Sequence, residues 1–180
     1  MSIRSAKKIA VIGCPGSGKT TFSVILGSIL NLPVKHLDLQ YWKKNWQRPS
    51  GEEWESKMNE LIQLSAWIID GNYIDTLEKR ITAAEFVIYL EFNKCVCLWN
   101  VVKRAIFWKS HCRASYQKEV ELSRPTWRKQ LYLIKLICRF DKKQQLRIIN
   151  SISGASKKIL YIKKYKDMRL MLTKLKSQIN

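Results

Sequence analysis

The feature that most constrains this chain is the segment from Gly13 to Thr20, which reads Gly-Cys-Pro-Gly-Ser-Gly-Lys-Thr. It matches the pattern G-x-x-x-x-G-K-S/T at every fixed position. Glycines let the backbone approach an anion closely, and successive N–H groups can then converge on a phosphate. An apolar run precedes the segment at residues 8–13, and an apolar helical pattern follows it at residues 20–30. The sequence therefore predicts a phosphate-binding loop between a buried strand and a helix N-terminus.

The residues of this loop have expected roles in binding ATP or GTP with Mg²⁺. Lys19 is expected to reach the β- and γ-phosphates, and the Thr20 hydroxyl is expected to ligate Mg²⁺. The backbone of the loop would bind the phosphates. The predicted nucleotide-binding residues are Gly13, Cys14, Pro15, Gly16, Ser17, Gly18, Lys19, Thr20 and Thr21.

Short apolar runs alternate with helical patterns along the rest of the chain. Further strands are expected at residues 34–37, 67–69, 85–91 and 159–162, and further helices at 52–64, 94–108, 124–152 and 167–179. This alternation predicts an α/β fold with a parallel sheet covered by helices on both faces. Ligands of such sheets bind at the carboxyl ends of the strands. No composition shift marks a boundary, and 180 residues fit one domain, so residues 1–180 are predicted to form a single domain.

Two carboxylates follow predicted strands and are therefore expected at this edge. Asp70 ends the apolar run at residues 67–69, and it suits the magnesium ion because hard cations take oxygen ligands. The alternative is a turn-forming Asp-Gly pair. Asp38 ends the second strand and can orient an acceptor hydroxyl or take its proton. The alternative for Asp38 is a capping role at the next helix.

Aromatic residues cluster directly after Asp38. Tyr41, Trp42 and Trp46 would form an aromatic wall for the acceptor, or they would pack in the core or in a lid. The sequence alone leaves both interpretations open.

Several segments together resemble one family, the DNA topology modulation proteins, which are adenylate-kinase-like P-loop proteins of bacteria. The similar segments are the phosphate loop, His36-Leu37-Asp38, Trp67-Ile68-Ile69-Asp70-Gly71-Asn72-Tyr73, Val87-Ile88-Tyr89-Leu90 and Cys97-Leu98-Trp99. The resemblance covers residues 7 to about 105 and, more loosely, the rest. It implies the P-loop nucleoside triphosphate hydrolase fold, a five-stranded parallel sheet with the Asp70 strand beside the phosphate-loop strand, and a small helical lid at about 109–123.

The resemblance also bears on the acceptor side. Asp-Gly-Asn-Tyr is similar to the Asp-Gly-Phe-Pro-Arg of adenylate kinases, whose aspartate serves the magnesium. Phe-Pro-Arg is missing here, so the acceptor need not be a nucleoside monophosphate. Arg80 follows this segment and can hold an acceptor-side phosphate through its fork. Arg104 ends the helix before the lid, where adenylate kinases place an arginine against the nucleotide. For both arginines the alternative is a solvated helix charge.

Positive charge is concentrated in the second half of the chain. Residues 91–180 hold 22 Lys and Arg against 5 Asp and Glu, which accounts for +17 of the formal net charge of +19. Such a field attracts polyanions, whether nucleotides, nucleic acid or an anionic membrane surface, but Lys-rich solvated helix faces would give the same count. The expected lid contains Lys109, Arg113 and Lys118. Which of them contacts a phosphate is open.

The remaining features bear on compartment. The five cysteines are odd in number and lack a disulfide-framework spacing, which favours reduced thiols in the cytoplasm. No apolar run approaches the ~18 residues of a membrane span.

The sequence thus predicts an ATP-dependent phosphotransferase, a small kinase that transfers the γ-phosphate to an unidentified nucleotide or small-molecule acceptor. Lys19, Asp38, Arg80 and Arg104 are the predicted catalytic residues, and Thr20 and Asp70 are the predicted metal ligands. Closure of a basic lid would exclude water from the reaction. The alternative is a nucleotide-gated DNA-binding protein that affects DNA topology, and nucleic-acid binding by the kinase itself would be non-specific.

Overall fold

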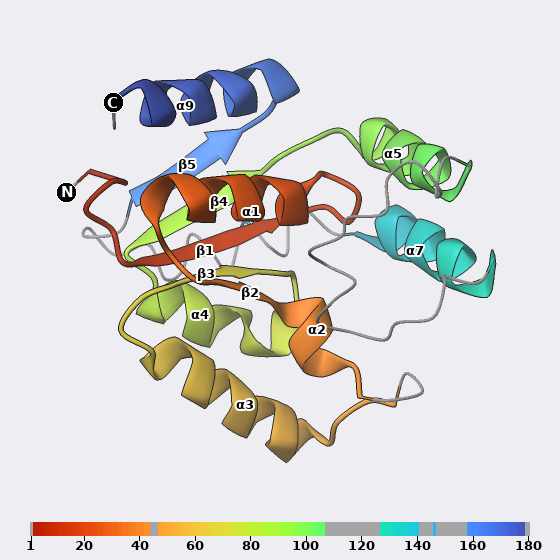
Figure 1. Cartoon of the computed structure of the whole chain (residues 1–180). Helices are drawn as coiled ribbons and strands as arrows, with labels where there is room; N and C mark the ends of the chain where they lie inside the picture. The colour runs from red at the N-terminus through yellow and green to blue at the C-terminus, as the bar shows by residue number, and fades with distance from the viewer. Residues whose placement is uncertain (1, 44–46, 107–126, 141–145, 147–157, 179–180) are drawn as a thin grey trace.

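The computed structural model describes residues 2–43, 47–106, 127–140, 146 and 158–178. Five strands form one parallel sheet in the order β2-β3-β1-β4-β5 (Figure 1). The strands are β1 Lys8–Gly13, β2 Val34–His36, β3 Trp67–Asp70, β4 Phe86–Leu90 and β5 Lys158–Ile162. The predicted five-stranded parallel sheet is confirmed, and the Asp70 strand does lie beside the phosphate-loop strand.

Helices cover both faces of this sheet. On one face lie α1 (Lys19–Leu30) and α9 (Tyr165–Ser177), and on the other lie α3 (Gly51–Gln63) and α4 (Leu77–Ala83) (Figure 1). Near the carboxyl ends of the strands, α5 (Lys94–Ile106) packs against α7 (Trp127–Arg139). Two short elements, α2 (Leu37–Tyr41) and η2 (Ile74–Thr76), directly follow β2 and β3. No helix in the described ranges is both long and apolar enough to cross a membrane.

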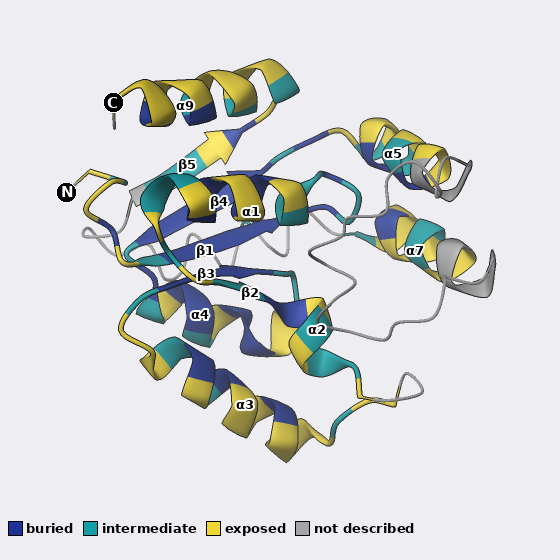
Figure 2. Ribbon diagram, in the orientation of Figure 1, coloured by how far each residue is buried: buried dark blue, intermediate teal, exposed yellow. Residues whose placement is uncertain are grey.

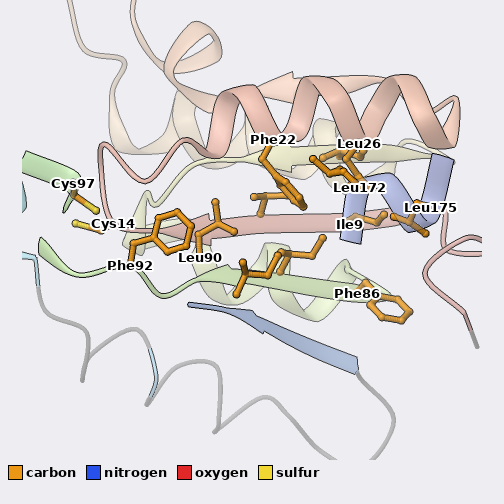
Figure 3. Close-up of a cluster of buried hydrophobic side chains, with 14 of the residues drawn as sticks. Ile9, Cys14, Phe22, Leu26, Phe86, Leu90, Phe92, Cys97, Leu172 and Leu175 are labelled. Carbon is orange, nitrogen blue, oxygen red and sulfur yellow. The ribbon is translucent and has the colours of Figure 1, made fainter. Parts of the chain in front are cut away.

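The alternation of side chains along β1 builds two hydrophobic cores, one under each helical layer. Ile9 and Val11 join the core that contains Phe22 and Leu26 of α1, together with residues of α9 (Figure 3). The intervening Ala10 and Ile12 face α3 and α4, where they join residues such as Trp54, Met58, Leu77 and Ile81. Because both faces are covered, the central strands are buried, apart from the half-buried Lys8 at the start of β1, and they form continuous apolar runs (Figure 2).

Local signals explain where α3 begins and where α1 ends. At the start of α3, the Ser50 hydroxyl accepts a hydrogen bond from the Glu53 amide at 3.1 Å, and the Glu53 carboxylate accepts one from the Ser50 amide at 2.9 Å. This reciprocal capping box contributes about 1 kcal/mol to helix stability. At the carboxyl end of α1, Asn31 takes a left-handed conformation with φ 53° and ends the helix.

Several expected boundaries shift by one or two residues, and parts of the expected helical stretch and lid lie outside the described residues. β2 ends at His36, one residue early, because Leu37 already begins α2 and is buried. Only α7 of the helical stretch expected at residues 124–152 is described as a helix of several turns. The lid expected at about 109–123 is outside the described part of the chain.

Candidate functional site

The phosphate loop connects β1 to α1 at the carboxyl edge of the sheet. Gly13, Gly16 and Gly18 have φ values of 142°, 83° and 89°, which side chains disfavour. A Cβ atom on Gly13 would lie 2.5 Å from the Leu90 carbonyl oxygen, and one on Gly16 would lie 2.5 Å from the Cys97 carbonyl oxygen. The glycines of the motif therefore let the loop pack directly against the end of β4 and against α5.

Lys19 points back into this loop. Its Nζ donates hydrogen bonds to the carbonyl oxygens of Gly13 at 2.7 Å and Cys14 at 3.0 Å. Burial lowers the pKa of Lys19, while the nearby charges of Asp70 and Asp38 raise it. The ammonium thus lies close to both predicted carboxylates. Phosphate oxygens would be stronger acceptors for it than the two neutral carbonyls.

Asp70 ends β3 and pairs with a histidine from the neighbouring strand. The parallel register sets His36 of β2 opposite Asp70, and His36 Nδ1 lies 2.9 Å from Asp70 Oδ1. Both side chains are buried. The other carboxylate oxygen, Oδ2, is buried and has no hydrogen-bond partner among the described residues. A buried carboxylate oxygen left in this way favours a cation, so Asp70 fits the predicted magnesium role with the half-buried Thr20.

His36 was not among the predicted site residues. Its signal lies in strand pairing, because two parallel strands that end at the same level place their last residues side by side. Only the strand order, β2 next to β3, turns the two distant positions into a pair.

Asp38 lies in the first turn of α2. The residue as a whole is exposed at the surface, but protein groups surround its carboxylate. Tyr73 donates its hydroxyl to Asp38 Oδ1 at 3.0 Å. Loss of solvent around the carboxylate raises the pKa of Asp38, and the hydrogen bond from Tyr73 opposes this rise. A carboxylate of raised pKa is a stronger base than an ordinary aspartate.

Four rings next to Asp38 form what we call the aromatic cluster: Tyr41, Trp42, Trp54 and Tyr73. The Tyr41 ring centroid lies 4.6 Å from that of Tyr73, 4.9 Å from that of Trp54 and 5.2 Å from that of Trp42. Trp54 is buried, whereas the other three rings are half-buried. Tyr41 therefore packs against the core and Trp42 lies edge-on against Tyr41, while the third predicted ring, Trp46, is outside the described residues.

The structure corrects the expectation for Arg80. Its side chain is fully buried, and its guanidinium donates to the carbonyl oxygens of Gly71 at 2.8 Å and Tyr73 at 2.9 Å. It is neither a solvated helix charge nor available to an acceptor phosphate, because both hydrogen-bonding nitrogens face the backbone after β3. Arg104 lies in α5, but its side chain is outside the described part of the structure.

The phosphate loop is also held by two asparagine side chains that were not predicted to belong to the site. Asn72, two residues after Asp70, accepts a hydrogen bond from the Gly13 amide at 3.1 Å and donates one to the Gly13 carbonyl oxygen at 2.6 Å. From the other side, Asn100 of α5 donates to the Gly16 carbonyl oxygen at 2.8 Å and to the Tyr165 hydroxyl at 2.6 Å. These contacts join residues far apart in sequence, so no local pattern indicates them.

Comparison with known proteins supports the fold class. No protein-family model matches the sequence, and no curated protein matches it. Among solved structures, the chain is similar to a shikimate kinase from Bacteroides thetaiotaomicron, with a TM-score of 0.53 and 13% identity over 97% of this chain and 99% of that one. A shikimate kinase from Acinetobacter baumannii in complex with shikimate gives 0.52 and 14%, over 98% and 94% of the chains. A gluconokinase from Sinorhizobium meliloti 1021 gives 0.52 and 13%, over 95% and 90%.

At these identities the likeness establishes the fold alone. The chain has the fold of small P-loop kinases, as the five-stranded parallel sheet and the loop between β1 and α1 also indicate.

Proposed function

We propose that this protein is a small kinase that transfers the γ-phosphate of ATP to a nucleotide or a hydroxyl-bearing small molecule. One observation carries the proposal: Lys19 folds into the phosphate loop after β1, and the neighbouring strand β3 ends in Asp70, whose Oδ2 is buried without a hydrogen-bond partner in the described part of the chain. Phosphoryl transfer depends mainly on positioning and charge stabilisation, and these are the groups that it needs.

On the nucleotide side, the amides of the loop and the N-terminus of α1 would bind the phosphates. Lys19 would exchange its two backbone acceptors for phosphate oxygens. Asp70 and Thr20 would hold Mg²⁺, which neutralises charge on the phosphates when it is bound.

On the acceptor side, Asp38 would take the proton of the attacking hydroxyl as its oxygen approaches the γ-phosphate. Its raised pKa suits it to this role, and the hydrogen bond from Tyr73 fixes the carboxylate. The half-buried rings of the aromatic cluster, Tyr41, Trp42 and Tyr73, would form one wall of the acceptor site.

Acceptor-dependent release of ADP from Mg-ATP tests this function on the purified full chain. A suitable panel contains nucleoside monophosphates and hydroxylated acids such as shikimate and gluconate, which the similar structures suggest. We expect one acceptor class to raise ADP release far above the water background, and Lys19→Ala to abolish that rise. Failure of the protein to bind either Mg-ATP or Mg-GTP would contradict the proposal.

The charge distribution favours one second candidate, a nucleotide-gated DNA-binding protein. The net charge of +17 in residues 91–180 would attract a polyanion. The family resemblance of the sequence agrees with this candidate in name only, because that name describes an effect on DNA and not a chemistry.

A further inference from the structure

The carbonyl oxygen of Gly13 is the meeting point of two side chains. Lys19 Nζ donates to it at 2.7 Å, and Asn72 Nδ2 donates to it at 2.6 Å. A backbone carbonyl has two lone pairs, so these two donors fill its capacity. Gly13 is buried, and its oxygen would depend on these donors once solvent is excluded.

Asn72 is held in place independently of Lys19. The guanidinium of Arg80 binds the carbonyls on both sides of Asn72, those of Gly71 and Tyr73. Gly71 has φ 142°, and its amide donates to the Val11 carbonyl oxygen at 3.2 Å, which ties the segment to β1. The Asn72 amide is therefore preset against Gly13 by buried backbone contacts.

We propose that Asn72 is a positioning residue that frees Lys19 for the phosphates. When Lys19 leaves the Gly13 oxygen to bind a phosphate, Asn72 remains as a donor to that oxygen and holds both backbone groups of Gly13. Without Asn72, the same movement of Lys19 would leave a buried carbonyl unpaired. The inference rests on the proposed function only in taking the phosphates to be those of a bound nucleotide.

A double-mutant cycle without nucleotide tests whether the two side chains share Gly13. The variants are Asn72→Ala, Lys19→Met and the pair, and the measurement is the free energy of unfolding in urea. Each single variant leaves the Gly13 oxygen one donor, whereas the double variant leaves none. We therefore expect the double variant to lose more stability than the sum of the single losses. Additive losses would overturn the proposal.

The design of the cycle separates the shared contact at Gly13 from other effects of the substitutions. The Gly13 amide loses its Asn72 acceptor with and without Lys19, so that loss cancels in the comparison. Asn59→Ala, on α3 away from the loop, is the matched control and should be additive with Lys19→Met. If Asn72→Ala fails to fold, Asn72→Ser takes its place in the same cycle.

Binding measurements test the role in nucleotide recognition. By calorimetry, Asn72→Ala should weaken Mg-ATP binding about tenfold, the consequence of one unpaired buried acceptor. The loss should be the same for Mg-tripolyphosphate, because Asn72 acts at the phosphate end. Unchanged affinity for both probes would overturn the proposal. Absence of binding by the unmodified protein would instead contradict the proposed function, and the unfolding cycle would then decide alone whether Asn72 and Lys19 share Gly13.

Discussion

His36 and Asp70 end neighbouring parallel strands, and their side chains meet at 2.9 Å between Nδ1 and Oδ1. The bond fixes one oxygen of the Asp70 carboxylate. It leaves Oδ2 buried and without a hydrogen-bond partner in the described part of the chain, at the edge where Lys19 also lies. This arrangement separates the role of Asp70 from that of Asp38, whose partner is Tyr73.

Substitution of Asp70 and substitution of Asp38 should therefore have different effects on activity. Asp70→Asn should raise the Mg²⁺ concentration needed for activity, because the metal site loses a charge. Asp38→Asn should leave Mg-ATP binding near that of the unmodified protein and lower the transfer rate by about 10²–10⁴-fold, the usual contribution of a general base. Steady-state kinetics across a Mg²⁺ titration measure both effects.

The exposed carboxylate of Asp75 in η2 provides the control, since Asp75→Asn should change neither quantity. Equal metal dependence and equal nucleotide affinity in the Asp70 and Asp38 variants would refute this division of roles.

The pH dependence of turnover should report Asp38. The carboxylate must be deprotonated to accept a proton, and its pKa is raised mainly by loss of solvent, so activity should fall as pH drops through a value above that of an ordinary aspartate. Tyr73 donates to the charged form and lowers that pKa. Tyr73→Phe should therefore move the acid limb of the kcat profile to higher pH. An acid limb that stays in place or moves to lower pH would show that Asp38 is not the titrating base.

Arg80 should matter for stability rather than for acceptor binding. Arg80→Leu leaves the Gly71 and Tyr73 carbonyls without their buried donor and should cost about 2–4 kcal/mol of unfolding free energy. Lys79→Ala is the matched neighbouring variant. Because Lys79 pairs with Glu55 at the surface, its loss should cost less than about 1 kcal/mol. Urea unfolding compares the two variants. If Arg80→Leu kept full stability but lost acceptor affinity, the original expectation of a phosphate contact would stand instead.

Sequence patterns predicted the parts of the site that depend on local chemistry. The glycines of the loop form a recognisable sequence motif, because only glycine tolerates the positive φ values and the close packing at Gly13 and Gly16. The strands could be predicted from their continuous apolar sequences, because both faces of β1, β3 and β4 are buried. The position of Asp70 at the edge of the sheet could be predicted because it directly follows one of these apolar sequences.

The contacts between distant segments were not predictable in this way. Asn72 meets Gly13 across 59 positions of sequence, and His36 meets Asp70 across 34. Arg80 was expected to hold an acceptor-side phosphate because it follows the Asp70 segment, whereas its partners in the described part of the chain are backbone carbonyls that no residue pattern marks. Strand order and the path of the chain after β3 decide all three contacts.

DNA binding distinguishes the kinase from its alternative. Any protein this basic binds duplex DNA at low salt, and log K falls by about 0.9 per phosphate contact for each tenfold rise in salt. At about 150 mM salt, where the Debye length is only about 8 Å, we expect weak binding that is indifferent to sequence and to Mg-ATP. A gel-shift titration with and without Mg-ATP measures this. Tight, sequence-selective binding that depends on the nucleotide would favour the DNA-binding switch.

The central claim is that Lys19 and its loop bind the phosphates of a nucleotide, and calorimetry of Mg-ATP binding to the unmodified protein and to Lys19→Ala tests it most directly. The variant removes a charged donor whose hydrogen-bond partners in the described part of the chain are two backbone carbonyls, so the fold should survive, as circular dichroism would confirm. We expect binding to weaken by about 2–4 kcal/mol, or to disappear, through loss of charge-assisted bonds to phosphate. Equal affinities of the two proteins for Mg-ATP would contradict the account.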